Sequence, residues 1–195
     1  MQRIDHYTST AKWLHWAMAA IWLCAWLLGL SAVHWHSINA DHRITLLHKA
    51  LASTVLVLVV VRVAWRLAHP APALPASMAP AMRRAAHTGH LFLYGVALMA
   101  LPLSGWLWSS SGNHEVWMLG LVKLPALMAP NEAVQHAVGI FHTWVAWLCG
   151  ALVGGHVLIA LKHHFIDRDT VLLGMLPRRL QRQPSTRPST PPTAP

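Results

Sequence analysis

Four stretches of this sequence are apolar and long enough to cross a lipid bilayer as helices, which takes about 20 residues each. We predict these helices at residues 13–33, 46–67, 91–108 and 138–161. Charged residues make up only 11% of the 195-residue chain, well below the roughly 25% of soluble domains. The predicted fold is therefore all-α, an integral membrane four-helix bundle. It takes up residues 1–180 as one domain, and residues 181–195 form a disordered tail rich in Pro, Ser and Thr.

The basic residues predict the orientation of these helices. Most of the 15 Lys and Arg residues lie before the first stretch, around the connection between the second and third, and after the fourth. By the positive-inside rule these segments face the cytoplasm, so both termini are predicted inside. The net charge of +9 is thus accounted for by topology. Nucleic acid is not expected as a partner, because the basic residues flank helices and do not alternate with aromatic residues on one face.

The connections are predicted to hold no further domain. Residues 68–82 are rich in Pro and Ala, which predicts an extended linker. Residues 117–130 are apolar but too short to span the bilayer, and Pro125 and Pro130 interrupt them, so we expect them at the outer interface.

Histidines lie inside the apolar stretches at matching depths. In the fourth stretch, His142 and His156 are separated by nearly four helical turns, which places them on one helical face about 21 Å apart along the axis. Because successive helices run in opposite directions, His15 is predicted level with His156 near the cytoplasm, and His48 level with His142 near the outside. We call His15 and His156 the inner pair and His48 and His142 the outer pair.

Two stacked pairs of imidazoles indicate two bound groups, each held from opposite sides. Ionisable side chains inside a membrane are costly and are usually functional, and helix bundles build cofactor sites from facing helices. Haem is the best fit, since an iron with an axial imidazole on each side has no open position and is suited to electron transfer. Two alternatives remain open. Each histidine could be hydrogen-bonded singly to a neighbouring helix, or the four could line a proton or metal transport path without haem.

Two arginines follow the same spacing. Arg62 follows His48 at this same interval, hence on the same face of the second helix at the level of the inner pair, and Arg66 follows one turn later. Arginine can hold a haem propionate through two hydrogen bonds, although both side chains could instead extend to the cytoplasmic interface. Glycines near the histidines would let a flat macrocycle or a helix approach the backbone closely, and these are Gly139, Gly150, Gly154 and Gly155.

Six sequence segments resemble the four-helix bacterial cytochrome b561 family and cover residues 12–177 in the same order. They are "KWLHW" at 12–16, "LLHKALAS" at 46–53, "RVAWRLAHPAPALP" at 62–75, "AAHTGHLFLYGVALMALPLSGW" at 85–106, "FHTWVAW" at 141–147 and "GHVLIALKHHFIDRDTVLLGMLP" at 155–177. The resemblance implies two non-covalent b-type haems, each ligated by two histidines, at the positions of His15, His48, His142 and His156. Relatives often have Arg where Gly174 stands, and the Pro/Ser/Thr tail lies beyond the family's usual end.

The resemblance also implies a function and a location. Proteins of this family are multi-pass proteins of the bacterial inner membrane that move electrons between the quinone pool and another partner, and superoxide at the outer face is among the proposed partners. Ubiquinone is the expected quinone. Quinone chemistry needs protons, which His87 and His90 could carry because they share a helical face at the inner end of the third helix. His163 and His164 could do the same, and all four could also be interfacial residues without a catalytic role.

The outer surface gives one further candidate, Lys49. The basic and acidic residues predicted outside balance, so the surface as a whole is not expected to attract an anion, but Lys49 lies beside His48 and could line a local entry. A different function also fits the sequence: the protein could be an anchor subunit that passes electrons from a dehydrogenase or hydrogenase to quinone. The absence of large loops for docking speaks against that alternative.

Overall fold

The computed structural model describes residues 7–73 and 78–176. Three membrane-spanning segments are single helices, namely α1 (Ser9–His34), α2 (Arg43–Ala68) and α5 (Glu132–Lys162). The remaining span is continuous from Pro80 to Ser111 and consists of α3 (Pro80–Phe92), a π-helical segment η2 (Leu93–Ala100) and α4 (Leu101–Ser111). All four spans are long and apolar enough to cross a membrane, which confirms the predicted all-α membrane bundle.

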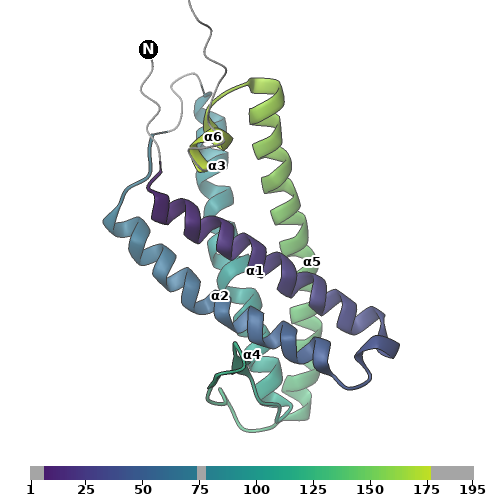
Figure 1. Cartoon of the computed structure of the whole chain (residues 1–195). Coiled ribbons are helices and arrows are strands. Elements are labelled where there is room, and N and C mark those ends of the chain that lie inside the picture. Colours follow the sequence, from purple (N-terminus) through teal and green to yellow (C-terminus); the bar gives the residue numbers. More distant parts are fainter. Residues whose placement is uncertain (1–6, 74–77, 177–195) are drawn as a thin grey trace, which may run out of the picture.

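The spans form two packed pairs. Figure 1 shows α1 and α2 as an inclined pair that crosses the more upright third span and α5. The 3₁₀ turn η1 (His36–Asn39) joins α1 to α2 at one end of the bundle, where residues 112–131 join α4 to α5. A π-helical turn, η3 (His163–Asp167), and the short helix α6 (Val171–Met175) lie at the opposite end, close to the start of α1.

Several boundaries differ from those expected. The linker predicted over residues 68–82 ends earlier, because α3 begins at Pro80, whose fixed φ suits the first turn of a helix. The polar residues of α3 hide this helix from a hydropathy pattern. A hairpin of β1 (Trp117–Met118) and β2 (Val122–Lys123) was not expected. The predicted disordered tail, residues 181–195, lies outside the described residues.

The hairpin lies against the part of α2 that carries His48, where the Leu119 amide donates a hydrogen bond to the carbonyl of Ala50 at 3.4 Å. Before the hairpin, Glu115 accepts hydrogen bonds from the side chains of Lys123 and Trp117, and these donors lower the pKa of its carboxyl group. The contacts of Glu115 with Lys123 and Trp117 are therefore expected to persist at pH values above the ordinary carboxyl pKa of 4.5. They should be lost as the pH falls through the lowered pKa of Glu115.

The π-helical segment has a local cause in the sequence. Pro102 follows it and has no N–H, so it cannot donate to the carbonyl four residues earlier, and its ring crowds that carbonyl in a regular α-helix. The helix widens instead, and the Leu101 amide donates to the carbonyl of Val96. The neighbouring carbonyl of Ala97 accepts a hydrogen bond from the Trp22 indole at 3.0 Å.

An apolar layer fills the middle of the bundle. Its buried residues come from all four spans and are Trp22, Val55, Ala97, Leu101, Val145 and Cys149. Cys149, whose exposed fraction is 0%, lies midway in sequence between His142 and His156. The layer therefore separates the levels of the outer and inner pairs.

Candidate functional site

The structure brings together the histidines that the sequence placed at equal depth. The imidazole centroids of His15 and His156 lie 6.2 Å apart, and those of His48 and His142 also lie 6.2 Å apart. All four side chains are half-buried. Each pair joins one helix of the α1–α2 pair to α5, so both pairs lie between the two packed halves of the bundle.

The hydrogen bonds of the outer pair determine which ring nitrogens are protonated. The Nδ1–H of His48 donates to the carbonyl of Ala25 at 2.7 Å. Ser104 donates its hydroxyl proton to the carbonyl of Leu101 at 2.7 Å, so its oxygen accepts the Nδ1–H of His142 at 2.9 Å. Both imidazoles therefore keep an unprotonated Nε2, the arrangement typical of metal-ligating histidines.

The outer imidazoles pack directly against the helix backbone at two glycines. A Cβ atom on Gly29 would lie 2.9 Å from Cε1 of His48, and a Cβ atom on Gly105 would lie 3.0 Å from Cε1 of His142. Both positions are in regular helix, where glycine is disfavoured relative to alanine. We infer that glycine occurs here because only a residue without a side chain leaves room for the rings.

Charged and polar side chains surround the inner pair. The Arg62 guanidinium donates from Nη2 to Nδ1 of His15 at 3.3 Å and from Nε to the Tyr94 hydroxyl oxygen at 2.6 Å. The His90 ring lies 5.5 Å, centroid to centroid, from the ring of His156. In contrast to the outer pair, the Nδ1 atom of His15 accepts a hydrogen bond, which leaves the proton on Nε2.

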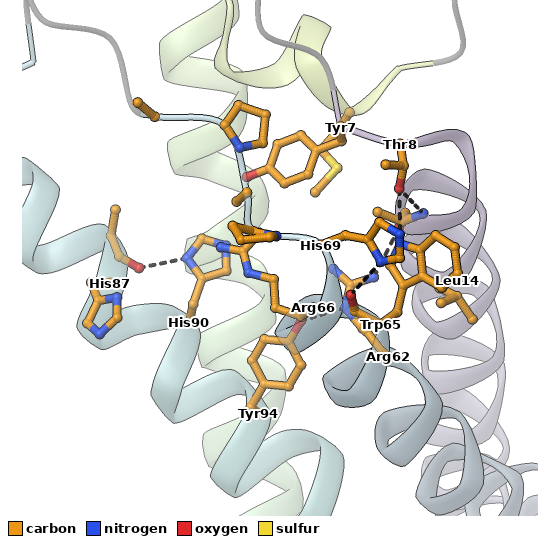
Figure 2. Close-up of a pocket in the computed structure, with 17 residues that line it drawn as sticks. Tyr7, Thr8, Leu14, Arg62, Trp65, Arg66, His69, His87, His90 and Tyr94 are labelled. Carbon is orange, nitrogen blue, oxygen red and sulfur yellow. Dashed lines mark hydrogen bonds between the residues drawn. The ribbon is translucent and has the colours of Figure 1, made fainter.

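A cavity of about 480 Å³ lies next to the inner pair, between the start of α1, the end of α2 and α3. Figure 2 shows Arg62, Arg66, His90 and Tyr94 among its lining residues. His87 also lines the cavity, but its ring lies apart from the other labelled side chains. The cavity thus collects two guanidinium groups, the phenols of Tyr7 and Tyr94, and imidazoles, a combination suited to an anionic or hydrogen-bonding ligand.

The remaining sequence candidates lie in separate places. Lys49 is half-buried beside His48, and among the described residues no hydrogen bond or ion pair involves its ammonium group. His163 bonds to Asp169 at the end of α5, whereas His164 stacks edge to face on Phe165. The sequence therefore grouped histidines that have different surroundings.

For none of the four glycines selected from sequence is a paired histidine among the nearest neighbours of an added Cβ atom. A Cβ atom on Gly139 would meet the ring of Trp108, and one on Gly150 would meet the ring of Trp26. A Cβ atom on Gly154 or Gly155 would meet no atom of another helix within 4 Å in the described part of the chain. Gly139 and Gly150 thus let side chains of other helices come close to the backbone of α5, which is one of the two roles predicted for these glycines.

The interval between the histidines of α5 would have found two of the missed residues. Gly29 follows His15 on α1 at that interval, which puts it at the level of the outer pair, and Ser104 follows His90 in the same way on the third span. The same arithmetic that selected Arg62 thus selects a partner on each remaining helix. Only the structure shows that Gly29 and Ser104 contact the histidines of the outer pair.

Fold and site together define a four-span membrane protein with two imidazole pairs at two depths. The family model of prokaryotic cytochrome b561 matches residues 6–178. The chain belongs to the prokaryotic cytochrome b561 family. It is a multi-pass bacterial membrane protein of electron transfer, and the family implies that it binds b-type haem.

Two relatives match the chain over most of its length, and a third matches about half of it. The protein is 35% identical over 173 residues to "Cytochrome b561 homolog 2" of Escherichia coli (strain K12), covering 88% of this chain and 92% of that protein. It is 25% identical over 169 residues to "Probable superoxide oxidase CybB" of Yersinia pestis, covering 85% and 93%. It is also 32% identical over 96 residues, covering 49% and 53%, to "Cytochrome b561 homolog 1" of Escherichia coli (strain K12).

Proposed function

We propose that the protein binds two b-type haems, one between the histidines of each pair, and carries electrons across the bacterial inner membrane. The observation that carries this proposal is the equal spacing of the imidazoles, 6.2 Å between centroids at both levels. Two metal–nitrogen bonds of about 2 Å each, together with the size of the two rings, require a centroid separation of about 6 Å. Both pairs meet that requirement.

The surrounding side chains fit the group at the outer level. His48 and His142 each hold a proton on Nδ1 and present Nε2, as ligation of iron requires. Gly29 and Gly105 keep the space beside both rings free of side chains. The protein thus fixes the orientation of both outer ligands through its own hydrogen bonds and packing.

At the inner level the fit depends on Arg62. Ligation through Nε2 of His15 requires that the proton move to Nδ1, and the Arg62 guanidinium must then release that nitrogen. Arg62 and Arg66 line the adjacent cavity, where the carboxylate of a haem propionate would provide a stronger partner than a neutral imidazole. We therefore assign both arginines to the propionates of the inner haem.

Electron transfer is the chemistry this arrangement supports. A haem iron ligated by two imidazoles changes between the ferric and ferrous states without binding oxygen. The spacing of His142 and His156 corresponds to about 21 Å along α5, so the two sites divide the crossing into two steps. The apolar layer that contains Cys149 excludes water between them.

The quinone pool is the partner we propose on the inner side. Reduction of ubiquinone needs protons as well as electrons, and His90 is the better donor of the two candidates on α3. Its ring is 5.5 Å from that of His156, and it lines the same cavity as Arg62 and Tyr94. His87 is a second carrier at the margin of that cavity.

The outer partner is proposed to be a small redox molecule, and superoxide is the specific candidate. One relative has the name probable superoxide oxidase, and Lys49 places a positive charge beside His48. In the predicted orientation both termini face the cytoplasm, so His48, His142 and Lys49 lie toward the outside.

The test is a haem count combined with single substitutions. We expect a pyridine haemochrome assay and a reduced-minus-oxidised spectrum of purified protein to give two b haems per chain. His142→Ala should remove the outer haem and His156→Ala the inner haem, and His48→Ala and His15→Ala should reproduce these losses. A well-folded preparation without haem would refute the proposal and favour a histidine-lined transport path.

The quinone step is tested separately on protein that holds both haems. We expect His90→Gln to slow the reduction of ubiquinone-1 by pre-reduced protein by about 100-fold, as is usual for the loss of an acid–base group, with a smaller effect from His87→Gln. Equal rates in His90→Gln and wild type would remove His90 from the proposed proton path.

A further inference from the structure

The short helix α6 is held to the start of α1 by two side chains on either side of His15. The ammonium group of Lys12 donates to the carbonyl of Leu176 at 2.9 Å, and the indole N–H of Trp16 donates to the carbonyl of Met175 at 2.9 Å. The ring of Trp16 also packs edge to face on the ring of His15, at 5.2 Å between centroids. One helical turn thus carries both the inner histidine and the anchors of α6.

The preceding segment is held to the end of α5. Nδ1 of His163 bonds to a carboxylate oxygen of Asp169 at 2.6 Å, and the Asp169 amide donates to the carbonyl of His163 at 3.1 Å. The other carboxylate oxygen of Asp169 accepts the amide of Val171, the first residue of α6, at 3.0 Å. His163 lies about two turns beyond His156.

Residues 163–176 therefore form a strap that joins the helix ends carrying the two inner histidines. Burial of Lys12 indicates that the anchor is specific, because its exposed fraction is only 7% and a buried ammonium group is costly unless it is hydrogen-bonded. A loop that merely covered the surface would not need a buried cation.

A cation site is the competing explanation for part of the strap. His163, Asp167 and Asp169 offer atoms within 4.8 Å of one another. However, Lys162 already pairs with both carboxylate oxygens of Asp167, at 2.8 and 2.7 Å, and Asp169 is used to begin α6. The cluster is accounted for as the anchor of the strap.

We propose that the strap sets the distance and orientation of His15 relative to His156, so that Lys12 and Trp16 are positioning residues for the inner haem. This inference rests on the proposed function. It goes beyond it by assigning a role to a segment outside the four spans, and it predicts that the outer pair does not depend on the strap.

Conservative variants on α1 separate this role from general stability. Trp16→Phe keeps an aromatic ring beside His15 but removes the indole N–H, and Lys12→Met removes the ammonium group at similar length. Trp13→Phe is the matched control, because Trp13 has an exposed fraction of 76%, and among the described residues no hydrogen bond from its indole is found. Lys12→Arg retains a donor and should restore the wild-type behaviour.

We expect Trp16→Phe and Lys12→Met to speed transfer of the inner haem to apomyoglobin by about 10-fold, a typical effect of losing a group that supports a ligand. The midpoint potential of the inner haem should also shift, while the outer haem keeps its potential and release rate. His156→Ala and His142→Ala identify which component is which. Release rates that match the Trp13→Phe control, or equal weakening of both haems, would overturn the proposal.

A measurement without haem makes the outcome independent of the proposed function. Spin labels attached through Trp13→Cys and Leu158→Cys, in a background with Cys24 and Cys149 replaced by alanine, report the distance between the inner ends of α1 and α5. We expect a narrow distance distribution that broadens on Lys12→Met. An unchanged distribution would refute the strap, whereas wild-type protein without two haems would refute the proposed function alone.

Discussion

The outer and inner histidine pairs have the same spacing but different surroundings. At the outer pair, each Nδ1–H donates to a group held by a neighbouring helix, the carbonyl of Ala25 or the hydroxyl of Ser104. At the inner pair, the charged side chain of Arg62 donates to His15, and a cavity of about 480 Å³ lies alongside.

This difference separates two ways of building the same kind of site. The outer pair is organised by a backbone carbonyl, a short serine side chain and close packing against glycines. The inner pair is organised by a long, mobile side chain that can exchange one partner for another. We therefore expect haem binding at the outer site to be weakened by any added side-chain volume. At the inner site we expect the midpoint potential to depend mainly on the charge of nearby residues.

The largest effect should come from filling the space beside His48. We expect Gly29→Ala to weaken binding of the outer haem by about 10- to 100-fold, because the added Cβ would lie 2.9 Å from the imidazole. Gly95→Ala is the control, since a Cβ atom at position 95 would meet no atom of the described residues within 4 Å beyond its chain neighbours and its own helix backbone. The haem content of both purified proteins measures the difference. Full haem content in Gly29→Ala would show that the outer site is not limited by space.

Removal of the Arg62 charge should act on the inner site alone. We expect Arg62→Gln to lower the inner midpoint potential by about 50 mV, because a nearby cation stabilises the reduced, less positive iron. Arg62→Lys keeps the charge but cannot bind a carboxylate through two parallel hydrogen bonds. Its inner midpoint potential should therefore lie between those of wild type and Arg62→Gln. Redox titration followed in the visible spectrum measures both components. A shift confined to the outer component would contradict the assignment.

A smaller shift of opposite sign is expected at the outer site. Ser104→Ala removes the acceptor of the His142 Nδ1–H, which makes the imidazole a weaker electron donor and should raise the outer potential by about 40 mV, equivalent to a hydrogen bond of about 1 kcal/mol. Ser53→Ala, which changes another buried serine, serves as the control in the same titration. Identical shifts in the two variants would indicate a general effect of packing.

The smallest effect concerns Lys49. We expect Lys49→Gln to slow the reaction with superoxide by about 2- to 5-fold at low ionic strength, less at high ionic strength, and not at all with a neutral outer reactant. Lys123→Gln is the matched control, because Lys123 is paired with Glu115 in the hairpin. Stopped-flow traces at two salt concentrations decide the matter. If both variants lose rate equally, the charge beside His48 has no local role.

The sequence predicted the spans and the depth of the four histidines because both depend on regular helix geometry. A run of apolar residues gives the span, and a separation close to a whole number of turns gives the face, as it did for His142 and His156. Those quantities are properties of one helix at a time. They survive errors in the ends of the helices, such as the start of the third span at Pro80, which was predicted at residue 91.

The supporting contacts could not be predicted, because they depend on how helices are placed against one another. The acceptor for His48 is a backbone carbonyl of Ala25 on another helix, and any residue type would provide that group. Helix α6 spans only Val171–Met175, too short for a periodic pattern. The neighbours of the glycines chosen from sequence could not be named for the same reason, since the atoms around Gly150 belong to Trp26 on another helix.

The π-helical segment between Leu93 and Ala100 restricts the number of residues that the third span can contain. It lies between His90, beside the inner pair, and Ser104, beside the outer pair. Deleting one residue from it would rotate α4 by about 100° relative to α3 and would turn Ser104 away from His142. A surface loop can tolerate insertions and deletions. In this segment they would separate Ser104 from His142, even at positions where the side chain itself could be replaced. The number of residues in this segment, more than their identity, lets His90 face the inner pair while Ser104 faces the outer pair.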